Sequence, residues 1–138
     1  MTNQKITVEV IIDRAVEKVW ELWNSPDHIV NWNHASDDWH TVRAENELRV
    51  GGRFFYRMEA KDKSFGFDFQ AVYDRVEENR ELTYTMIDDR CCKTIFDIMG
   101  QSTKIITTFD AENENLIELQ KAGWQAILNN FKKYAESI

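Results

Sequence analysis

A long amphipathic segment near the C-terminus, residues 116–135, constrains the fold more than any other part of the chain. On a helical projection its apolar residues share one half of the circumference: Leu116, Ile117, Leu119, Gly123, Trp124, Ile127, Leu128, Phe131, Tyr134 and Ala135. A helix of about 20 residues is on the order of 30 Å long and can cross a small domain. Asn115 followed by Glu118 predicts a capping box at its start. Two residues on the apolar face are unusual, Gly123 in mid-helix and Gln120 near the centre of the stripe.

The residues before this segment alternate apolar and polar side chains, which predicts one strand, two short helices and then a series of strands. The first strand is expected over residues 6–12, the helices over 15–24 and 26–33, and a polar loop over 33–41. Further extended segments are expected at 42–50, 52–62, 64–79, 80–87, 90–99 and 103–109. A β-bulge is predicted near residues 70–72, and Phe65, Phe67 and Phe69 fall on one face of their strand. Short hairpin loops are predicted at Asp88–Asp89 and Gly100–Gln101.

An antiparallel sheet that is apolar on one face needs a cover, and helix 116–135 is long and apolar enough to supply it. We therefore expect an α+β fold in a single domain, residues 1–138. A curved antiparallel sheet of about six to seven strands wraps around the long C-terminal helix, with two short helices after the first strand. Gly123 costs ~1 kcal/mol relative to alanine in mid-helix. We therefore expect Gly123 and Leu119 to lie where the helix packs closely against the sheet.

The composition excludes several classes of function. No apolar run approaches the ~20 residues of a membrane span, and none opens the chain as a signal peptide. The expected location is therefore cytoplasmic, without membrane insertion. The net charge of −7 argues against nucleic acid as a partner, because phosphate binding needs clustered lysines and arginines.

The residues most often used as metal ligands or nucleophiles form no recognisable motif. Cys91 and Cys92 are neighbours, so in a strand they point to opposite faces and do not form a disulfide with each other. His28, His34 and His40 surround the polar loop, where two aspartates also lie, but their spacing matches no metal motif. We interpret this group as part of a solvated loop. No catalytic residue, metal ligand or cofactor is assigned.

Four stretches together resemble a known superfamily. They are AVEKVWELWNSPDHIVNWN, LRVGGRFFYRMEAKD, SFGFDFQAVYDRVEENRELTYT and TKIITTFDAENENLIELQKAGWQAILNNFKKY. They are similar to the START-like (SRPBCC) superfamily, and within it to the family of the C-terminal domain of the heat-shock-protein-90 ATPase activator. The similarity runs from about residue 5 to 136. Such proteins often have a proline before the first helix, where this chain has Arg14–Ala15, which is expected to loosen the helix start.

The resemblance implies a helix-grip fold with a cavity between the sheet and the long helix. Members of the superfamily bind lipids, polyketides, sterols and plant hormones, and some are cyclases or aromatases. Inward-facing aromatic residues support binding of a small hydrophobic, lipid-, polyketide- or aromatic-like molecule, with Phe54 among them and Thr107 as one polar group. The residues expected to line the cavity are Trp20, Trp23, Tyr56, Met58, Phe67, Phe69, Tyr84, Phe96, Gln120, Trp124, Ile127 and Phe131.

Gln120 has two interpretations, because a buried amide without partners costs ~1–3 kcal/mol. Either it bonds to a partner within the protein, or it faces a cavity filled by water or ligand. In the second case Gln120→Leu would weaken ligand binding and leave the fold intact.

Two other functions compete with ligand binding. A cyclase or hydrolase would need a tuned acid or base in the cavity, yet Glu59, Asp68 and Asp97 fall on the outward phase of their strands. A chaperone-binding role follows from the family resemblance. However, the eukaryotic activators also have a separate N-terminal domain for which these residues leave no room. The expected oligomeric state is a monomer or weak homodimer.

Overall fold

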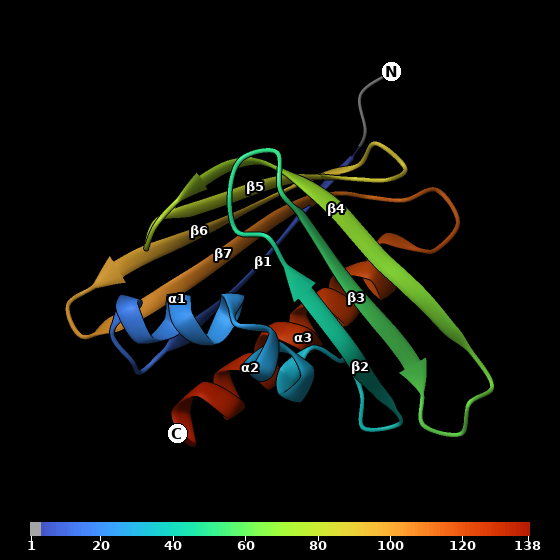
Figure 1. The fold of residues 1–138 in the computed structure, drawn as a ribbon, viewed down its shortest axis with the longest axis horizontal. Coiled ribbons are helices and arrows are strands. Elements are labelled where there is room, and N and C mark those ends of the chain that lie inside the picture. Colours follow the sequence, from blue (N-terminus) through green and yellow to red (C-terminus); the bar gives the residue numbers. More distant parts are fainter. Residues whose placement is uncertain (1–3) are drawn as a thin grey trace.

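The computed structural model describes residues 4–138 and has the expected α+β helix-grip fold (Figure 1). The elements follow in the order β1 (Lys5–Ile12), α1 (Val16–Asn24), α2 (Pro26–Trp32), β2 (Trp39–Asn46), β3 (Arg53–Ala60), β4 (Gly66–Glu77), β5 (Glu81–Met86), β6 (Cys91–Met99), β7 (Ser102–Asp110) and α3 (Ile117–Glu136). The strands form one antiparallel sheet in the order β1-β7-β6-β5-β4-β3-β2. The predicted fold class is therefore confirmed.

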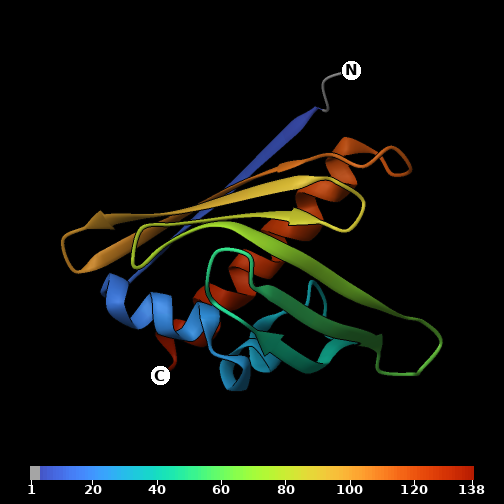
Figure 2. The ribbon, with the colours of Figure 1, turned by 45° about the horizontal axis from the view of Figure 1, so that its top comes forward.

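The sheet curves around α3, which crosses its concave side, while α1 and α2 cover the end near the C-terminus (Figure 2). Two register shifts in the strand pairing contribute to this curvature, because a bulge bends its strand and increases the twist. One lies between Thr41 and Arg43 in β2. The other lies between Tyr73 and Arg75 in β4, a few residues later than the predicted bulge.

The hairpins at both ends of β6 form where they were expected. Asp89 has φ 70° and Gly100 has φ 65°, both in the left-handed region. A tight turn needs such a conformation, and glycine and aspartate adopt it more readily than most residues. The loop predicted over 33–41 is shorter than expected, because β2 already begins at Trp39.

Helix α3 begins without the predicted capping box. Its N-cap residue is Leu116, and no side chain caps the helix there. The Asn115 amide instead donates a hydrogen bond to the Glu112 carboxylate in the preceding loop. Asn115 therefore stabilises the loop instead of capping the helix, and the capping-box prediction is wrong.

The predicted close approach of Gly123 and Leu119 to the sheet is also wrong. A Cβ added at Gly123 would meet no atom of residues 4–138 within 4 Å outside the helix's own backbone. Leu119 is 62% exposed. Phe65, predicted to share a strand face with Phe67 and Phe69, lies in the hairpin just before β4 begins and is 73% exposed. The contact of the N-terminal half of α3 with the sheet is made instead by Trp124, which stacks on Phe109 of β7 with ring centroids 3.9 Å apart.

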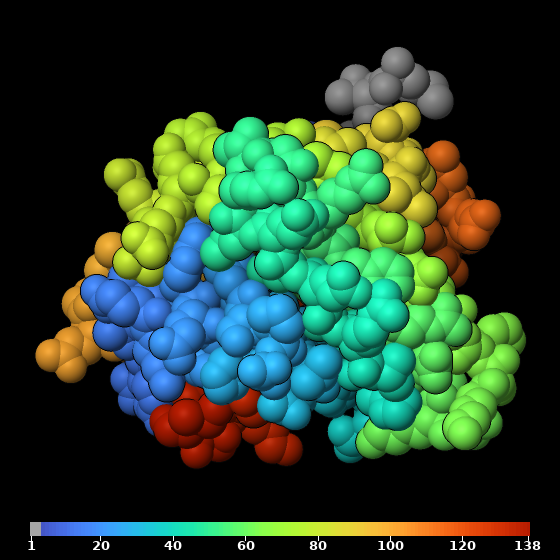
Figure 3. All heavy atoms as spheres, viewed as in Figure 1, coloured from blue at the N-terminus to red at the C-terminus, as the bar shows by residue number. Residues whose placement is uncertain are grey.

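The C-terminal half of α3 is well packed in an aromatic cluster. The ring of Phe131 lies 5.0 Å from Trp23 and 4.9 Å from Trp32, measured between ring centroids. Trp20 packs edge-on against Phe96 at 5.2 Å. Phe131 has no solvent exposure. In Figure 3, α1 and α2 in blue lie over the C-terminal end of α3 in red. The hydrophobic core is therefore densest at this end of the sheet.

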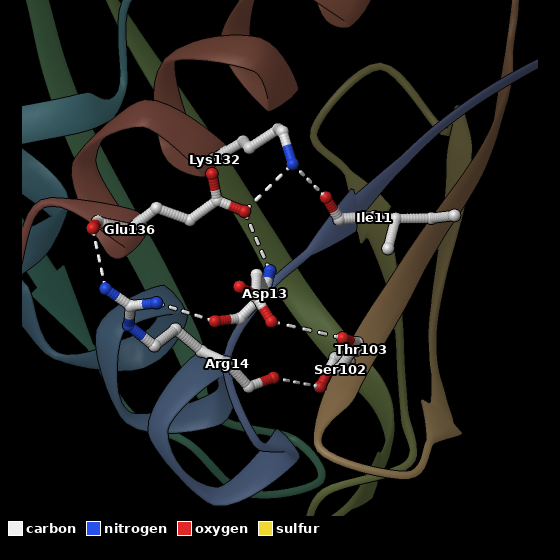
Figure 4. Close-up of polar contacts among 7 residues, drawn as sticks. All are labelled: Ile11, Asp13, Arg14, Ser102, Thr103, Lys132 and Glu136. Atoms are coloured by element: carbon white, nitrogen blue, oxygen red, sulfur yellow. Dashed lines mark hydrogen bonds and ion pairs between the residues drawn. The ribbon is translucent and has the colours of Figure 1, made fainter.

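Polar contacts fix the C-terminal end of α3 to the segment after β1 (Figure 4). Arg14 donates hydrogen bonds to the carbonyl oxygens of Asp13 and Glu136, both at 2.6 Å. The Glu136 carboxylate accepts from the Asp13 backbone N–H at 2.7 Å and from Lys132 Nζ at 2.8 Å. Lys132 also donates to the Ile11 carbonyl at 2.5 Å. Arg14, which was expected to loosen the start of α1, is thus part of a network that holds this corner.

Candidate functional site

A cavity of about 480 Å³ lies between the N-terminal half of α3 and the concave face of the sheet. Strands β3, β4 and β5 provide most of one wall, and α3 provides the opposite wall with Gln120, Gly123 and Trp124. The end of α2 and the loop before β2 close one end, and residues from the β5–β6 and β7–α3 loops close the other. Two of its lining residues, Leu119 and Phe67, are 62% and 45% exposed, so the cavity reaches the surface beside them.

The cavity wall is built mainly from aromatic rings. On the sheet side Phe54 stacks on Tyr56 with ring centroids 4.8 Å apart and on Phe69 at 5.6 Å. Across the cavity Trp124 stands edge-on to Phe69 at 6.3 Å. Strand alternation causes this arrangement, because every second residue of β3 and β4 points to the concave face. The result is a mostly apolar surface into which only a few polar groups project.

Most polar side chains on the wall already have partners. Tyr73 donates its hydroxyl proton to Asn46 Oδ1 at 2.6 Å. The Thr94 and Thr107 hydroxyls, 3.1 Å apart, share a hydrogen bond. The Tyr84 hydroxyl lies beside the Cys92 thiol of β6. The cavity therefore presents few polar groups that are free to bind a ligand.

Burial keeps these tyrosines in their neutral form. Desolvation raises the pKa of Tyr56 and of Tyr84 well above the ordinary value for a phenol. It likewise raises the pKa of the Cys92 thiol to about 12. Cys91, by contrast, is exposed, so the two neighbouring cysteines face opposite sides of the sheet as expected. A buried thiol with a raised pKa is a poor nucleophile.

The Gln120 side chain is fully engaged within the protein. Its amide oxygen accepts a hydrogen bond from the Glu112 N–H at 2.9 Å. Its amide nitrogen donates to the carbonyl oxygens of Glu112, at 3.2 Å, and Asn115, at 2.9 Å. Gln120 lines the cavity, but its polar atoms hold the β7–α3 loop against the helix. The first of the two sequence interpretations, a partner within the protein, is therefore the one observed.

Nine of the twelve residues expected at the cavity line it in the structure: Trp23, Tyr56, Met58, Phe67, Phe69, Tyr84, Gln120, Trp124 and Ile127. The other three, Trp20, Phe96 and Phe131, are buried in the aromatic cluster beside it and are not part of the lining. Sequence periodicity could not separate these groups, because it shows which face of a helix or strand is apolar and not which part of that face meets empty space.

Several lining residues were missed. Tyr73 continues the alternation of Phe67 and Phe69 and could have been found if the bulge had been placed after it. Trp39, assigned to a loop, begins β2 and contacts the Phe67 ring at 5.8 Å. Arg90 and Glu112 come from turns, for which sequence periodicity gives no signal.

The three histidines do not form a site. His28 Nδ1 lies 2.7 Å from the Tyr134 hydroxyl, while His40 belongs to β2. His34 lies in the loop after α2, where desolvation lowers its pKa. Within residues 4–138 no group of three or more histidine, cysteine or acidic side chains could hold a metal ion. No helix in that range is long and apolar enough to cross a membrane.

The sequence pattern of one family, "Activator of Hsp90 ATPase homolog 1-like protein", matches residues 13–136. The chain belongs to this family. A comparison with curated proteins finds no match.

Solved structures agree with the family assignment. An AHSA1-like protein of Aeromonas hydrophila is 46% identical over 97% of this chain and 93% of its own, with a TM-score of 0.91. A protein of Cytophaga hutchinsonii is 50% identical over 96% of this chain and 92% of its own, with a TM-score of 0.84. A protein of Chromobacterium violaceum shares the fold at 16% identity, with a TM-score of 0.84 and 96% of each chain covered.

Proposed function

We propose that the protein binds a small hydrophobic molecule in the cavity beneath α3. The supporting observation is the cavity itself, about 480 Å³ and walled by aromatic rings. Protein interiors normally contain few voids larger than one water molecule. Ligand sites typically measure ~300–1,000 Å³ and have mostly apolar walls with a few polar groups. The volume and chemistry of this cavity fit a ligand site better than a packing defect.

The position of Gly123 adds to this support. Glycine in mid-helix lowers stability by ~1 kcal/mol relative to alanine. Here it makes room for no neighbouring side chain, since an added Cβ would meet no atom of the described residues within 4 Å beyond its own helix. What it does is widen the cavity that it lines. A glycine that lowers helix stability and enlarges a cavity is expected where that cavity binds a ligand.

A cavity-filling variant provides the test. N-phenyl-1-naphthylamine, an uncharged fluorescent probe, should bind the wild type saturably with 1:1 stoichiometry. Gly123→Phe projects a ring into the cavity and should weaken binding about tenfold or more, while the matched control Gly123→Ala should bind as the wild type does. Absence of saturable binding to the wild type, or equal binding to Gly123→Phe, would contradict the proposal. Native mass spectrometry of freshly purified protein, followed by extraction, should then identify the natural ligand.

A second candidate function, association with a chaperone ATPase, is favoured by the family match alone. Its test is independent of the cavity: the protein should stimulate ATP hydrolysis by a heat-shock-protein-90 chaperone, and Gly123→Phe should stimulate it equally. No stimulation by the wild type would count against this function.

A further inference from the structure

The Tyr56 hydroxyl is a polar group of the cavity wall for which residues 4–138 supply no hydrogen-bond partner. Its ring, on β3, packs beside the rings of Phe54 and Phe69, whose centroids are 4.8 Å and 6.2 Å away. Its hydroxyl has no hydrogen-bond partner within residues 4–138, and its oxygen is not among the fully buried unpaired atoms of that range. Because the residue is half-buried and lines the cavity, the accessible side of the hydroxyl faces that space.

Other unpaired groups on the wall have the same character. Each indole N–H of Trp23 and Trp124 also lacks an acceptor among the described residues and is not sealed off by protein atoms. An indole N–H can only donate a hydrogen bond, and a neutral phenol donates readily. The raised pKa of Tyr56 keeps its proton in place at neutral pH. The unpaired groups of the cavity wall are therefore hydrogen-bond donors, and a ligand that pairs with them must carry a hydrogen-bond acceptor.

The charged groups near the cavity indicate that this acceptor is uncharged. Arg90 lies at the loop end and donates from Nε to Asp88 Oδ2 at 2.7 Å, so its charge is already compensated. Glu112 lies at the same end and accepts a hydrogen bond from Asn115. Around Tyr56 the wall is aromatic. A charged ligand group placed there would lose its hydration without gaining an opposite charge, which is strongly unfavourable.

On these grounds we propose that the natural ligand is an uncharged apolar molecule with a carbonyl-type oxygen that accepts a hydrogen bond from the Tyr56 hydroxyl. This inference rests on the proposed binding function and specifies its ligand class. A hydrocarbon of the same shape would fill the space but leave the hydroxyl unpaired. An unpaired buried donor costs free energy that a carbonyl acceptor recovers.

A matched pair of ligands and a matched pair of variants test the proposal. 9-Fluorenone and fluorene have nearly the same shape and differ in a single carbonyl group. The wild type should bind fluorenone about fivefold more tightly than fluorene, as expected for one net hydrogen bond. Tyr56→Phe should bind both equally, with its fluorene affinity unchanged. The control Tyr134→Phe removes a hydroxyl outside the cavity, one that is already bonded to His28, and should keep the preference.

The possible outcomes separate the two proposals. Equal affinity of the wild type for both compounds, or a preference that survives in Tyr56→Phe, would overturn the ligand class and leave the binding function standing. Failure of both compounds to bind any variant would contradict the binding function, and the ligand class with it. Tyr56→Phe removes only an unpaired hydroxyl, so its thermal unfolding temperature should match or exceed that of the wild type, which confirms that the variant is folded.

Discussion

A single side chain, Gln120, shows how the path of a neighbouring loop determines the role of a residue. From the sequence it is an amide in an apolar stripe, and that position alone fits a ligand contact or a structural contact equally well. The structure places the β7–α3 loop over it, and three hydrogen bonds to that loop use its oxygen and its nitrogen. No local pattern predicts this, because the path of an irregular loop has no sequence period.

Gln120→Leu is therefore expected to act on the loop. Leucine leaves the Glu112 N–H and two carbonyl groups without their partners, which should lower the free energy of unfolding by ~1–3 kcal/mol. Urea denaturation measures this loss, and amide hydrogen exchange should accelerate over residues 111–116. The control Lys121→Leu changes an exposed side chain one position away and should have little effect. Equal stability of both variants would show that the loop does not depend on Gln120.

The environment of His34, at the other end of the cavity from Gln120, predicts that the stability of the protein depends on pH. Its Nδ1 is buried without a partner among the described residues. Desolvation is the largest influence and lowers its pKa, Lys61 and His40 lower it further, and Asp37 opposes them. The unfolded chain thus binds a proton more readily than the folded protein, so stability should fall as the pH drops below about 6.5.

The measurement is the urea midpoint of wild type and His34→Gln at about pH 7.5 and about pH 5.5. The wild type should lose more stability between these values than the variant, which lacks the titrating ring. Parallel losses in both proteins would assign the pH dependence to other groups.

At the scale of elements, α3 consists of two halves with different surroundings. Its C-terminal half is enclosed by α1, α2 and the aromatic cluster around Phe131. Its N-terminal half lines the cavity, and there Leu119 is 62% exposed and the N-cap residue Leu116 is 69% exposed. The long helix, the strands and the order of these elements along the chain could be predicted, because apolar residues recur every 3.6 residues on a buried helix face and every second residue in a half-buried strand. The division of α3 was not, since an apolar stripe has the same sequence signature whether it faces side chains or empty space.

Gly123→Ala tests this view of the helix. The added methyl group meets no atom of residues 4–138 within 4 Å outside the helix backbone. The change should therefore raise the free energy of unfolding by about 1 kcal/mol through helix propensity alone. That gain corresponds to roughly 4 °C in the thermal midpoint, measured by circular dichroism. Destabilisation by alanine would instead indicate the tight helix–sheet contact that the sequence suggested.

At the scale of the whole molecule, the fold combines a packed end and an open end on one sheet. β1 pairs with β7 at one edge, which brings the segment after β1 to the C-terminal end of α3, where Arg14 and Glu136 meet. The helices α1 and α2 complete this end. Toward β3 and β4 the curved sheet rises away from α3 and leaves the cavity. Its volume depends on curvature, which arises from bulge positions and strand twist summed over many residues. No short stretch of sequence encodes that sum.

Replacing a phenylalanine by alanine should lower the free energy of unfolding more at the packed end of the sheet than at the cavity end. Phe131 has no exposure and is surrounded by Trp23 and Trp32, so Phe131→Ala should cost about 3–5 kcal/mol by opening a new void in a packed core. Phe69 borders a cavity that already exists, so Phe69→Ala opens no new void and should cost only the loss of apolar burial, about 1.5–3 kcal/mol or less. Urea denaturation of the two variants gives both values in one experiment. Equal losses would mean that the cavity end is as tightly packed as the core, and the space assigned to a ligand would then be filled by side chains in solution.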